Sequence, residues 1–133
     1  MPRLLPPTFA TTIAIAWKST PEAARALTAA MPFLLKAAKV IILSADEGHS
    51  GATTIESAAR LGRSLRWNGI DAELRRLSQA TDAPRDILKA VAETGADLLV
   101  MGAYSHSRAR ELILGGLTRR VLRDATLPVL FCH

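Results

Sequence analysis

The 133-residue sequence has little of what disulfide and metal chemistry require. Its single cysteine, Cys132, can form no internal disulfide and supplies no CxxC pair for a metal ion. The three histidines lie far apart and show no HxxxH or HxH spacing, which argues against a metal site built from local ligands. We therefore expect no metal centre, and the lone thiol favours a reducing, cytoplasmic compartment.

Aromatic side chains, strong charge and long apolar runs are also missing. The six aromatic residues are too few and too dispersed for a base-stacking platform. The net charge of +5 is a mild excess spread along the chain, which suits a small anionic ligand or a weak contact with a polyanion. No apolar run approaches the roughly 20 residues of a membrane helix. We predict binding to neither nucleic acid nor membrane.

What the sequence does contain is a regular alternation of strand and helix patterns. Short apolar or β-branched runs predict strands at residues 11–17, 40–45, 70–77, 98–101 and 128–132. The alternating pattern of the third run is typical of an exposed or edge strand. Helical spacing predicts helices at about residues 20–38, 53–68 and 82–94, and a last one after Gly116.

This order predicts an α/β fold: a single domain with a doubly wound, five-stranded parallel sheet, covered by helices on both faces. Residues 1–10 are expected to form an extended leader and residues 11–133 the domain. Pro32 should kink the first helix, and Gly69 should end the second. Trp67, at the end of that second helix, is expected to pack against the protein.

The segment after the fourth predicted strand is the best candidate for a binding site. Open sheets bind ligands beyond the carboxyl ends of their strands, where the strand order switches. Gly102 stands at such an end, and Gly115-Gly116 precede an amphipathic helical stretch. Glycines at a helix start expose backbone N–H groups within the positive field of the helix dipole, which favours an anion. The two glycines alone suit a tightly packed turn equally well.

The spacing from Gly102 through Ser105 to Gly115-Gly116 resembles the universal stress protein family, whose signature is G-x2-G-x9-G-[ST]. The flanking segments 96–101 and 119–130 are similar to that family as well. The resemblance covers residues 95–131 most strongly, and the chain looks like the second half of a tandem-domain member. It implies a Rossmann-like, adenine nucleotide alpha hydrolase-like fold and a role in stress response.

In ATP-binding members of that family, the motif glycines and the start of the last helix hold the phosphates. The resemblance therefore implies nucleotide-binding roles, with adenine at the end of the second strand, for Lys18, Ala45, Gly102, Ser105, Gly115, Gly116, Leu117 and Thr118. The ligand would be ATP or another adenine nucleotide, with or without magnesium.

Three of these positions depart from the family pattern. Ser105 replaces a glycine, Gly116 replaces Ser or Thr, and Lys18 stands where members carry an acid. Lost polar contacts at about 1–3 kcal/mol each would lower the affinity by one or more orders of magnitude. Lys18 either compensates by meeting a phosphate or is a solvated surface residue. We predict weakened nucleotide binding; the alternative is an interaction module of the same fold that binds no nucleotide.

No local arrangement of side chains predicts an enzyme. Asp97 lies at the amino-terminal side of its predicted strand, away from the ligand edge, so it is a poor general base. Slow ATP hydrolysis is the one enzymatic activity that the sequence does not exclude. The last strand, Val129, Leu130, Phe131 and Cys132, is apolar and is covered by no later element, which would make an unpaired edge a liability. We therefore predict a homodimer through this strand, with partner contacts that depend on the ligand.

Overall fold

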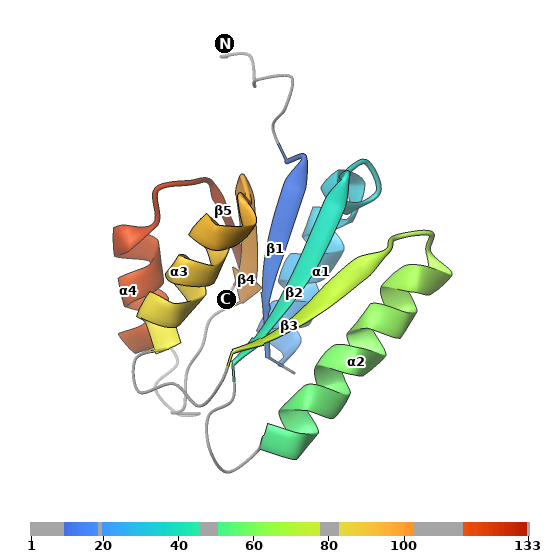
Figure 1. Ribbon diagram of the computed structural model, residues 1–133, viewed down its shortest axis with the longest axis horizontal. Coiled ribbons are helices and arrows are strands. Elements are labelled where there is room, and N and C mark those ends of the chain that lie inside the picture. Colours follow the sequence, from blue (N-terminus) through green and yellow to red (C-terminus); the bar gives the residue numbers. More distant parts are fainter. Residues whose placement is uncertain (1–9, 19, 46–50, 78–82, 103–115, 133) are drawn as a thin grey trace.

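A computed structural model describes residues 10–18, 20–45, 51–77, 83–102 and 116–132. Its elements in chain order are β1 (Thr12–Trp17), α1 (Pro21–Leu34), β2 (Lys39–Ala45), α2 (Gly51–Trp67), β3 (Ala72–Leu77), α3 (Ala83–Thr94), β4 (Leu98–Gly102), α4 (Gly116–Asp124) and β5 (Val129–Cys132) (Figure 1). The predicted alternation of strands and helices is confirmed. Apart from Ala10, the expected leader lies outside the described residues.

The five strands form one parallel sheet in the order β3-β2-β1-β4-β5. β1 is the central strand, where Ile13 is paired with Val40 of β2 on one side and with Leu98 of β4 on the other. The chain moves outward from β1 to β3 and then crosses back to β4, so the strand order switches between β1 and β4. The doubly wound α/β fold is confirmed, as is the place of β3 at an edge.

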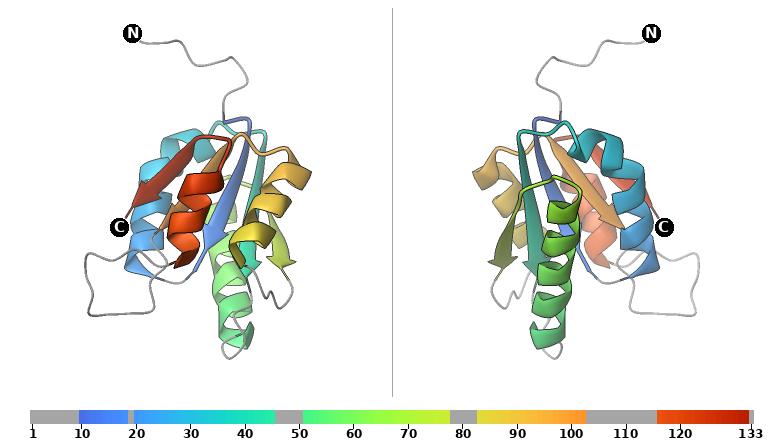
Figure 2. Two further views of the ribbon diagram at one scale, coloured as in Figure 1. Left: turned by 90° about the vertical axis from the view of Figure 1, so that its left-hand side faces the viewer. Right: turned by 90° about the vertical axis from the view of Figure 1, so that its right-hand side faces the viewer.

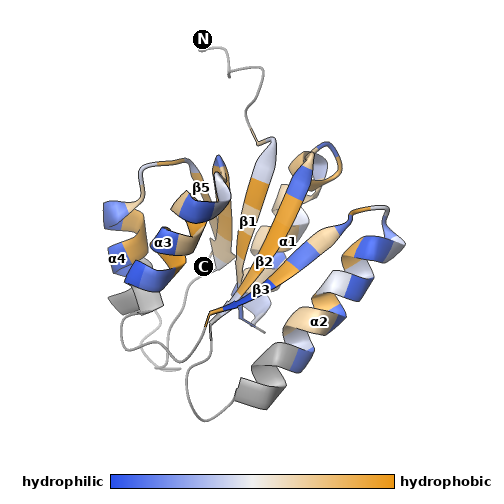
Figure 3. Ribbon diagram, in the orientation of Figure 1, coloured by the Kyte–Doolittle hydropathy of each residue, from blue (hydrophilic) through white to orange (hydrophobic). Residues whose placement is uncertain are grey.

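Helices cover the sheet on both faces. Helices α1 and α2 enclose one hydrophobic cluster, in which Ile13 and Ile42 are buried, and α3 and α4 enclose a second, which contains Ala14 and Ile41. Figure 2 shows α1 and α3 on opposite sides of the strands. Successive strand residues alternate between the two clusters because side chains of a strand point to opposite faces. The central strands β1, β2 and β4 are therefore largely apolar, whereas the edge strand β3 also carries charged residues (Figure 3).

Helix α1 begins as the sequence predicts. The Thr20 hydroxyl accepts a hydrogen bond from the Ala23 N–H at 3.1 Å, which caps the helix, and Pro21 occupies the first position. Its inner face is made of small residues except in the last turn, since Ala23, Ala26 and Ala30 are buried along with the terminal Leu34. The helix backbone can therefore lie close to the sheet.

The predicted end of α1 near Ala38 was wrong, because the helix stops at Leu34. Pro32 lies in its last turn and contributes no N–H to the helical hydrogen bonds. The Ala38 N–H instead donates to the Thr11 carbonyl at 2.8 Å, next to the start of β1. This hydrogen bond to a distant part of the chain directs the segment into β2.

Helix α2 ends in the predicted manner. Gly69 has a φ of +79°, and the following Ile70 N–H donates to the Leu65 carbonyl at 2.9 Å, as in a Schellman motif. The expected packing of Trp67 was wrong, because 90% of its surface is exposed. The helix buries Leu65 and its neighbours one and two turns earlier, and at 3.6 residues per turn Trp67 falls on the opposite side.

Replacement by alanine should have opposite effects at Gly62, within α2, and at Gly69, in the cap of that helix. Gly69→Ala places a Cβ in the left-handed region, so we expect a loss of about 1 kcal/mol in the free energy of unfolding. Gly62→Ala places its Cβ 3.8 Å from Cδ1 of Ile42, an ordinary contact, and should raise that free energy by up to about 1 kcal/mol. Urea unfolding followed by circular dichroism measures both. Effects of the same sign would contradict this account of the cap.

Candidate functional site

The candidate site lies at the edge where the parallel strands end and the helices begin (Figure 1). Ala16 of β1 is paired with Met101 of β4, so the next residues, Trp17 and Gly102, stand at neighbouring positions. On the other side Trp17 is paired with Ser44 of β2. The strand register thus brings the ends of β1, β2 and β4 together, as the sequence predicts for a ligand edge.

Two of the predicted nucleotide-binding residues are neighbours at this edge. Lys18 follows β1 directly, and Ala45 is the last residue of β2, one position beyond the paired Trp17 and Ser44. Lys18 is half-buried, and its carbonyl accepts a hydrogen bond from the Thr20 N–H at 2.8 Å. This bond links the residue after β1 to Thr20, the cap of α1.

The structure places two serines, Ser57 and Ser44, beside this edge, and the sequence alone does not indicate either. The Trp17 Nε1–H donates to the Ser57 Oγ of α2 at 2.9 Å, which ties the end of β1 to that helix. Ser44, paired with Trp17 across the strands, is 2% exposed, and its Oγ makes no hydrogen bond within the described structure. An unsatisfied buried hydroxyl costs about 1–3 kcal/mol. Ordered water or a bound polar group would relieve that cost at this position.

Gly102 has a structural task at the end of β4. A Cβ at this position would lie 2.4 Å from the backbone nitrogen of Ala23 and 2.5 Å from the carbonyl carbon of Glu22. Both atoms belong to the first turn of α1, so strand and helix meet backbone to backbone. The glycine therefore lets the amino-terminal end of α1 approach the switch point closely.

The remaining predicted residues belong to the segment that joins β4 to α4 or to the first turn of α4. Ser105 and Gly115 lie outside the described residues. Gly116 is the first residue of α4, and Leu117 and Thr118 follow it in the first turn, where N–H groups have no partner inside the helix. The first and last parts of the motif therefore stand at the end of β4 and at the start of α4.

Asp97 is a structural carboxylate, in agreement with its expected distance from the ligand edge. Its two oxygens accept hydrogen bonds from the N–H groups of Thr11 and Thr12 at 3.2 and 3.1 Å. The Asp97 N–H donates in turn to the Thr12 carbonyl at 2.8 Å. These bonds hold the start of β1 against the start of β4, at the opposite end of the sheet from the candidate site.

Two ion pairs of the described structure involve residues outside the predicted site. Arg123 and Asp124 form an ion pair at the last turn of α4, with Nε and Oδ1 2.9 Å apart, and this hydrogen bond lowers the pKa of Asp124. Arg75 of β3 is paired with Glu93 of α3. The residues that the structure describes contain no cluster of metal-binding side chains. Among these residues, no helix has the length and apolar character needed to cross a membrane.

The contact at Gly102 predicts a large cost for the smallest side chain. Gly102→Ala should lower the free energy of unfolding by about 1–3 kcal/mol, because backbone atoms of α1 must move to admit the methyl group. Chemical denaturation of the purified variant measures the loss. Gly62→Ala, whose added methyl group has room, is the matched control. A Gly102→Ala protein as stable as the parent would show that α1 does not constrain this strand end.

Comparison with known proteins agrees with the fold. Universal stress protein Slr1230 from Synechocystis sp. is 44% identical over 48 residues, which cover 36% of this chain and 17% of that protein. A universal stress protein from Archaeoglobus fulgidus DSM 4304 superposes with a TM-score of 0.72 at 20% identity, over 94% of this chain and 44% of that one. Each match thus spans less than half of the longer relative.

A further solved structure carries a ligand. The universal stress protein from Archaeoglobus fulgidus in complex with dAMP has a TM-score of 0.67 at 21% identity, over 92% of this chain and 96% of that one. The model of the Universal stress protein family matches residues 10–133, nearly the whole chain. The protein described here therefore belongs to the universal stress protein family.

Proposed function

We propose that this protein is a stress-response module that binds an adenine nucleotide, ATP above all, at the carboxyl edge of β1 and β4. One observation carries the proposal: the family motif begins where the switch-point strand β4 ends, at Gly102, and finishes where α4 starts, at Gly116. A helix amino-terminus beside a topological switch point is a favoured place for phosphate. The dAMP complex of a related protein supports the choice of an adenine nucleotide.

The chain's own residues suggest how the ligand would be held. Backbone N–H groups of Gly116, Leu117 and Thr118 are available in the first turn of α4 and would donate to the phosphates. Ser105 and Gly115 would border the same phosphates, as the motif implies. The ammonium of Lys18, at the end of β1, would add a positive charge. Magnesium, if bound with ATP, would neutralise part of the phosphate charge.

The base and the sugar would lie over the ends of the strands. The backbone of Ala45, next to Lys18 in register, would offer hydrogen bonds to adenine. Gly102 would admit the ligand close to β4, although its contact with α1 already accounts for a glycine here. A lysine in place of the family's acid changes the ligand's surroundings most on the nucleoside side, where it removes an acceptor for hydroxyl groups. We therefore propose weak binding and no efficient catalysis.

We also propose that two copies pair through β5. Val129, Leu130, Phe131 and Cys132 form the outer strand of the sheet beside β4 and are half-buried in the single chain. An apolar outer strand is stabilised when a second strand pairs with it. Nucleotide bound at the start of α4, the helix that leads into β5, would then influence the contacts between copies or with partners. The competing function is the same dimeric module without a nucleotide.

Titration with ATP and magnesium tests the nucleotide proposal. We expect weak binding by the parent protein and at least about tenfold tighter binding after Ser105→Gly with Gly116→Ser, about 1.4 kcal/mol. Calorimetry measures the affinities, and in a Trp67→Phe background the emission of Trp17 gives a second signal from the edge itself. Binding by neither protein would leave the module without nucleotide as the better description.

A single charge substitution tests the place of the phosphates. Gly115→Asp should abolish nucleotide binding, since it adds a side chain and a negative charge beside the helix start. Ala92→Asp, on the exposed side of α3, changes the charge equally and should leave the affinity unaltered. Retained affinity in the Gly115→Asp protein would place the anion elsewhere.

Sedimentation velocity at micromolar concentration tests the pairing of copies. We expect a dimer of about twice the 14.3 kDa chain mass. A single monomeric species over this concentration range would contradict pairing through β5.

A further inference from the structure

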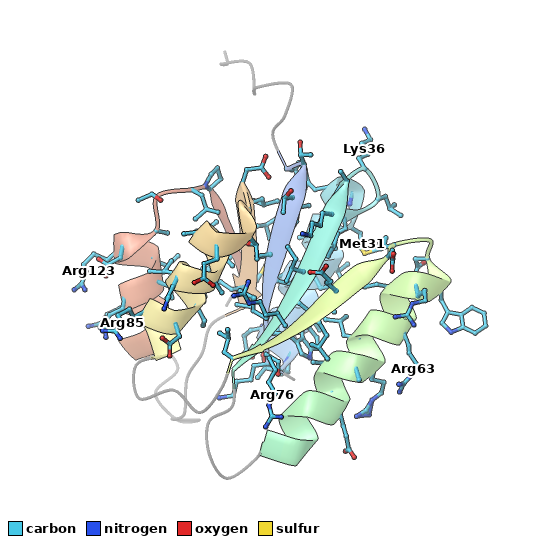
Figure 4. The ribbon with its side chains drawn as sticks, in the orientation of Figure 1. Met31, Lys36, Arg63, Arg76, Arg85 and Arg123 are labelled. Carbon is cyan, nitrogen blue, oxygen red and sulfur yellow. The ribbon has the colours of Figure 1, made fainter. Side chains whose placement is uncertain are left out.

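The outer side of α2 carries an unusual combination of side chains. The helix buries Ala58 and Leu65 against the sheet, and Arg60, Arg63 and Trp67 recur at i, i+3 and i+7 on the opposite side. All three are exposed, and Figure 4 shows Arg63 directed away from the strands. Arg66, also exposed, stands beside Trp67 in the sequence. We call Arg60, Arg63, Arg66 and Trp67 the α2 outer face.

Trp67 is the most exposed large apolar side chain of the described structure, at 90%. Single exposed apolar residues are common, but an indole with cationic neighbours is the composition of binding hot spots, where Trp and Arg are enriched. Here Arg63, Arg66 and Trp67 line a surface hollow of about 350 Å³. A second hollow of about 400 Å³ is lined by Arg60, Arg63, Ala59 and Glu56. Arg63 borders both, so the two hollows follow one another along the helix.

The charge of this face specifies the chemistry of what it would bind. From residue 56 to residue 67 there are three arginines and one acid, Glu56. Guanidinium groups form paired hydrogen bonds with carboxylates and are less strongly hydrated than ammonium groups, which suits them to interfaces. A complementary surface therefore presents carboxylates at helical spacing and an apolar group that covers the indole.

We propose that the α2 outer face binds an acidic, amphipathic segment of a partner protein. A second copy of this chain is a poorer match, since it carries only 12 acidic side chains against 17 basic ones, and four of these carboxylates are engaged within the chain: Glu22 with Arg25, Glu93 with Arg75, Asp97 with backbone N–H groups, and Asp124 with Arg123. A nucleic acid is a poorer match because one tryptophan makes no stacking platform. Helix α2 packs on β3 and β2, at the far edge of the sheet from β5, so pairing of copies through β5 leaves the α2 outer face open.

The experiment uses the full chain and a defined probe. The probe is a fluorescein-labelled 16-residue peptide with glutamates and leucines at helical spacing; its control has glutamine in place of every glutamate. Fluorescence anisotropy measures binding. We expect the acidic peptide to bind, and the affinity to fall at least tenfold with Arg60→Glu, Arg63→Glu and Arg66→Glu combined, and at least threefold with Trp67→Ala.

A charge-matched variant separates this site from general attraction. Lys36→Glu, Lys39→Glu and Lys89→Glu change the net charge by the same amount on exposed residues outside α2, and should alter the affinity less than threefold. The proposal is overturned if this variant loses as much affinity as the arginine variant, or if Trp67→Ala binds unchanged. It is overturned equally if the acidic peptide does not bind, if the glutamine peptide binds as well, or if a 20-base-pair DNA duplex binds more tightly.

Discussion

Helix α1 and the end of β4 meet backbone to backbone, and the candidate site is organised around that contact. Gly102 has no side chain to hold the two apart, and the inner face of the helix is built from alanines such as Ala23. Because α1 follows β1 almost at once, the contact lies close to Lys18, whose carbonyl accepts a hydrogen bond from the Thr20 N–H. A site that recognises an anion through backbone N–H groups needs such rigid placement, since those groups cannot adjust as long side chains do.

Most of the fold can be predicted from local sequence patterns. The central strands are short apolar runs because both sheet faces are covered, and the ends of α2 and α3 are marked by Gly69 and Gly95, whose positive φ angles few other residues adopt. The end of α1 could not be predicted in this way. Residues 35–38 have helical composition, and a hydrogen bond from Ala38 to Thr11 decides their conformation. The expected packing of Trp67 was wrong because the hydrophobicity of a single residue does not determine which side of a helix it occupies.

The candidate site was predictable in place but not in detail. A switch point at the carboxyl edge follows from the strand order, and the motif that spans it came from a family resemblance. Which atoms meet there depends on register and on contacts between distant segments. A side chain at position 102 would clash with the backbone of Ala23, and the Trp17 indole donates a hydrogen bond to Ser57 of α2. Neither pair can be predicted from spacing in the sequence. The unsatisfied hydroxyl of Ser44 can be recognised only from its burial in the structure.

The position of β1 has a consequence for synthesis of the chain on the ribosome. β1 is made first, yet it lies in the middle of the finished sheet, and one of its two neighbours, β4, is translated about eighty residues later. Until then a nascent chain can assemble only β1, β2 and β3, which leaves an apolar central strand with an open side. Asp97, just before β4, carries the carboxylate that accepts hydrogen bonds from the N–H groups of Thr11 and Thr12. β1 can therefore gain its second neighbour only after Asp97 and the whole of β4 have left the exit tunnel.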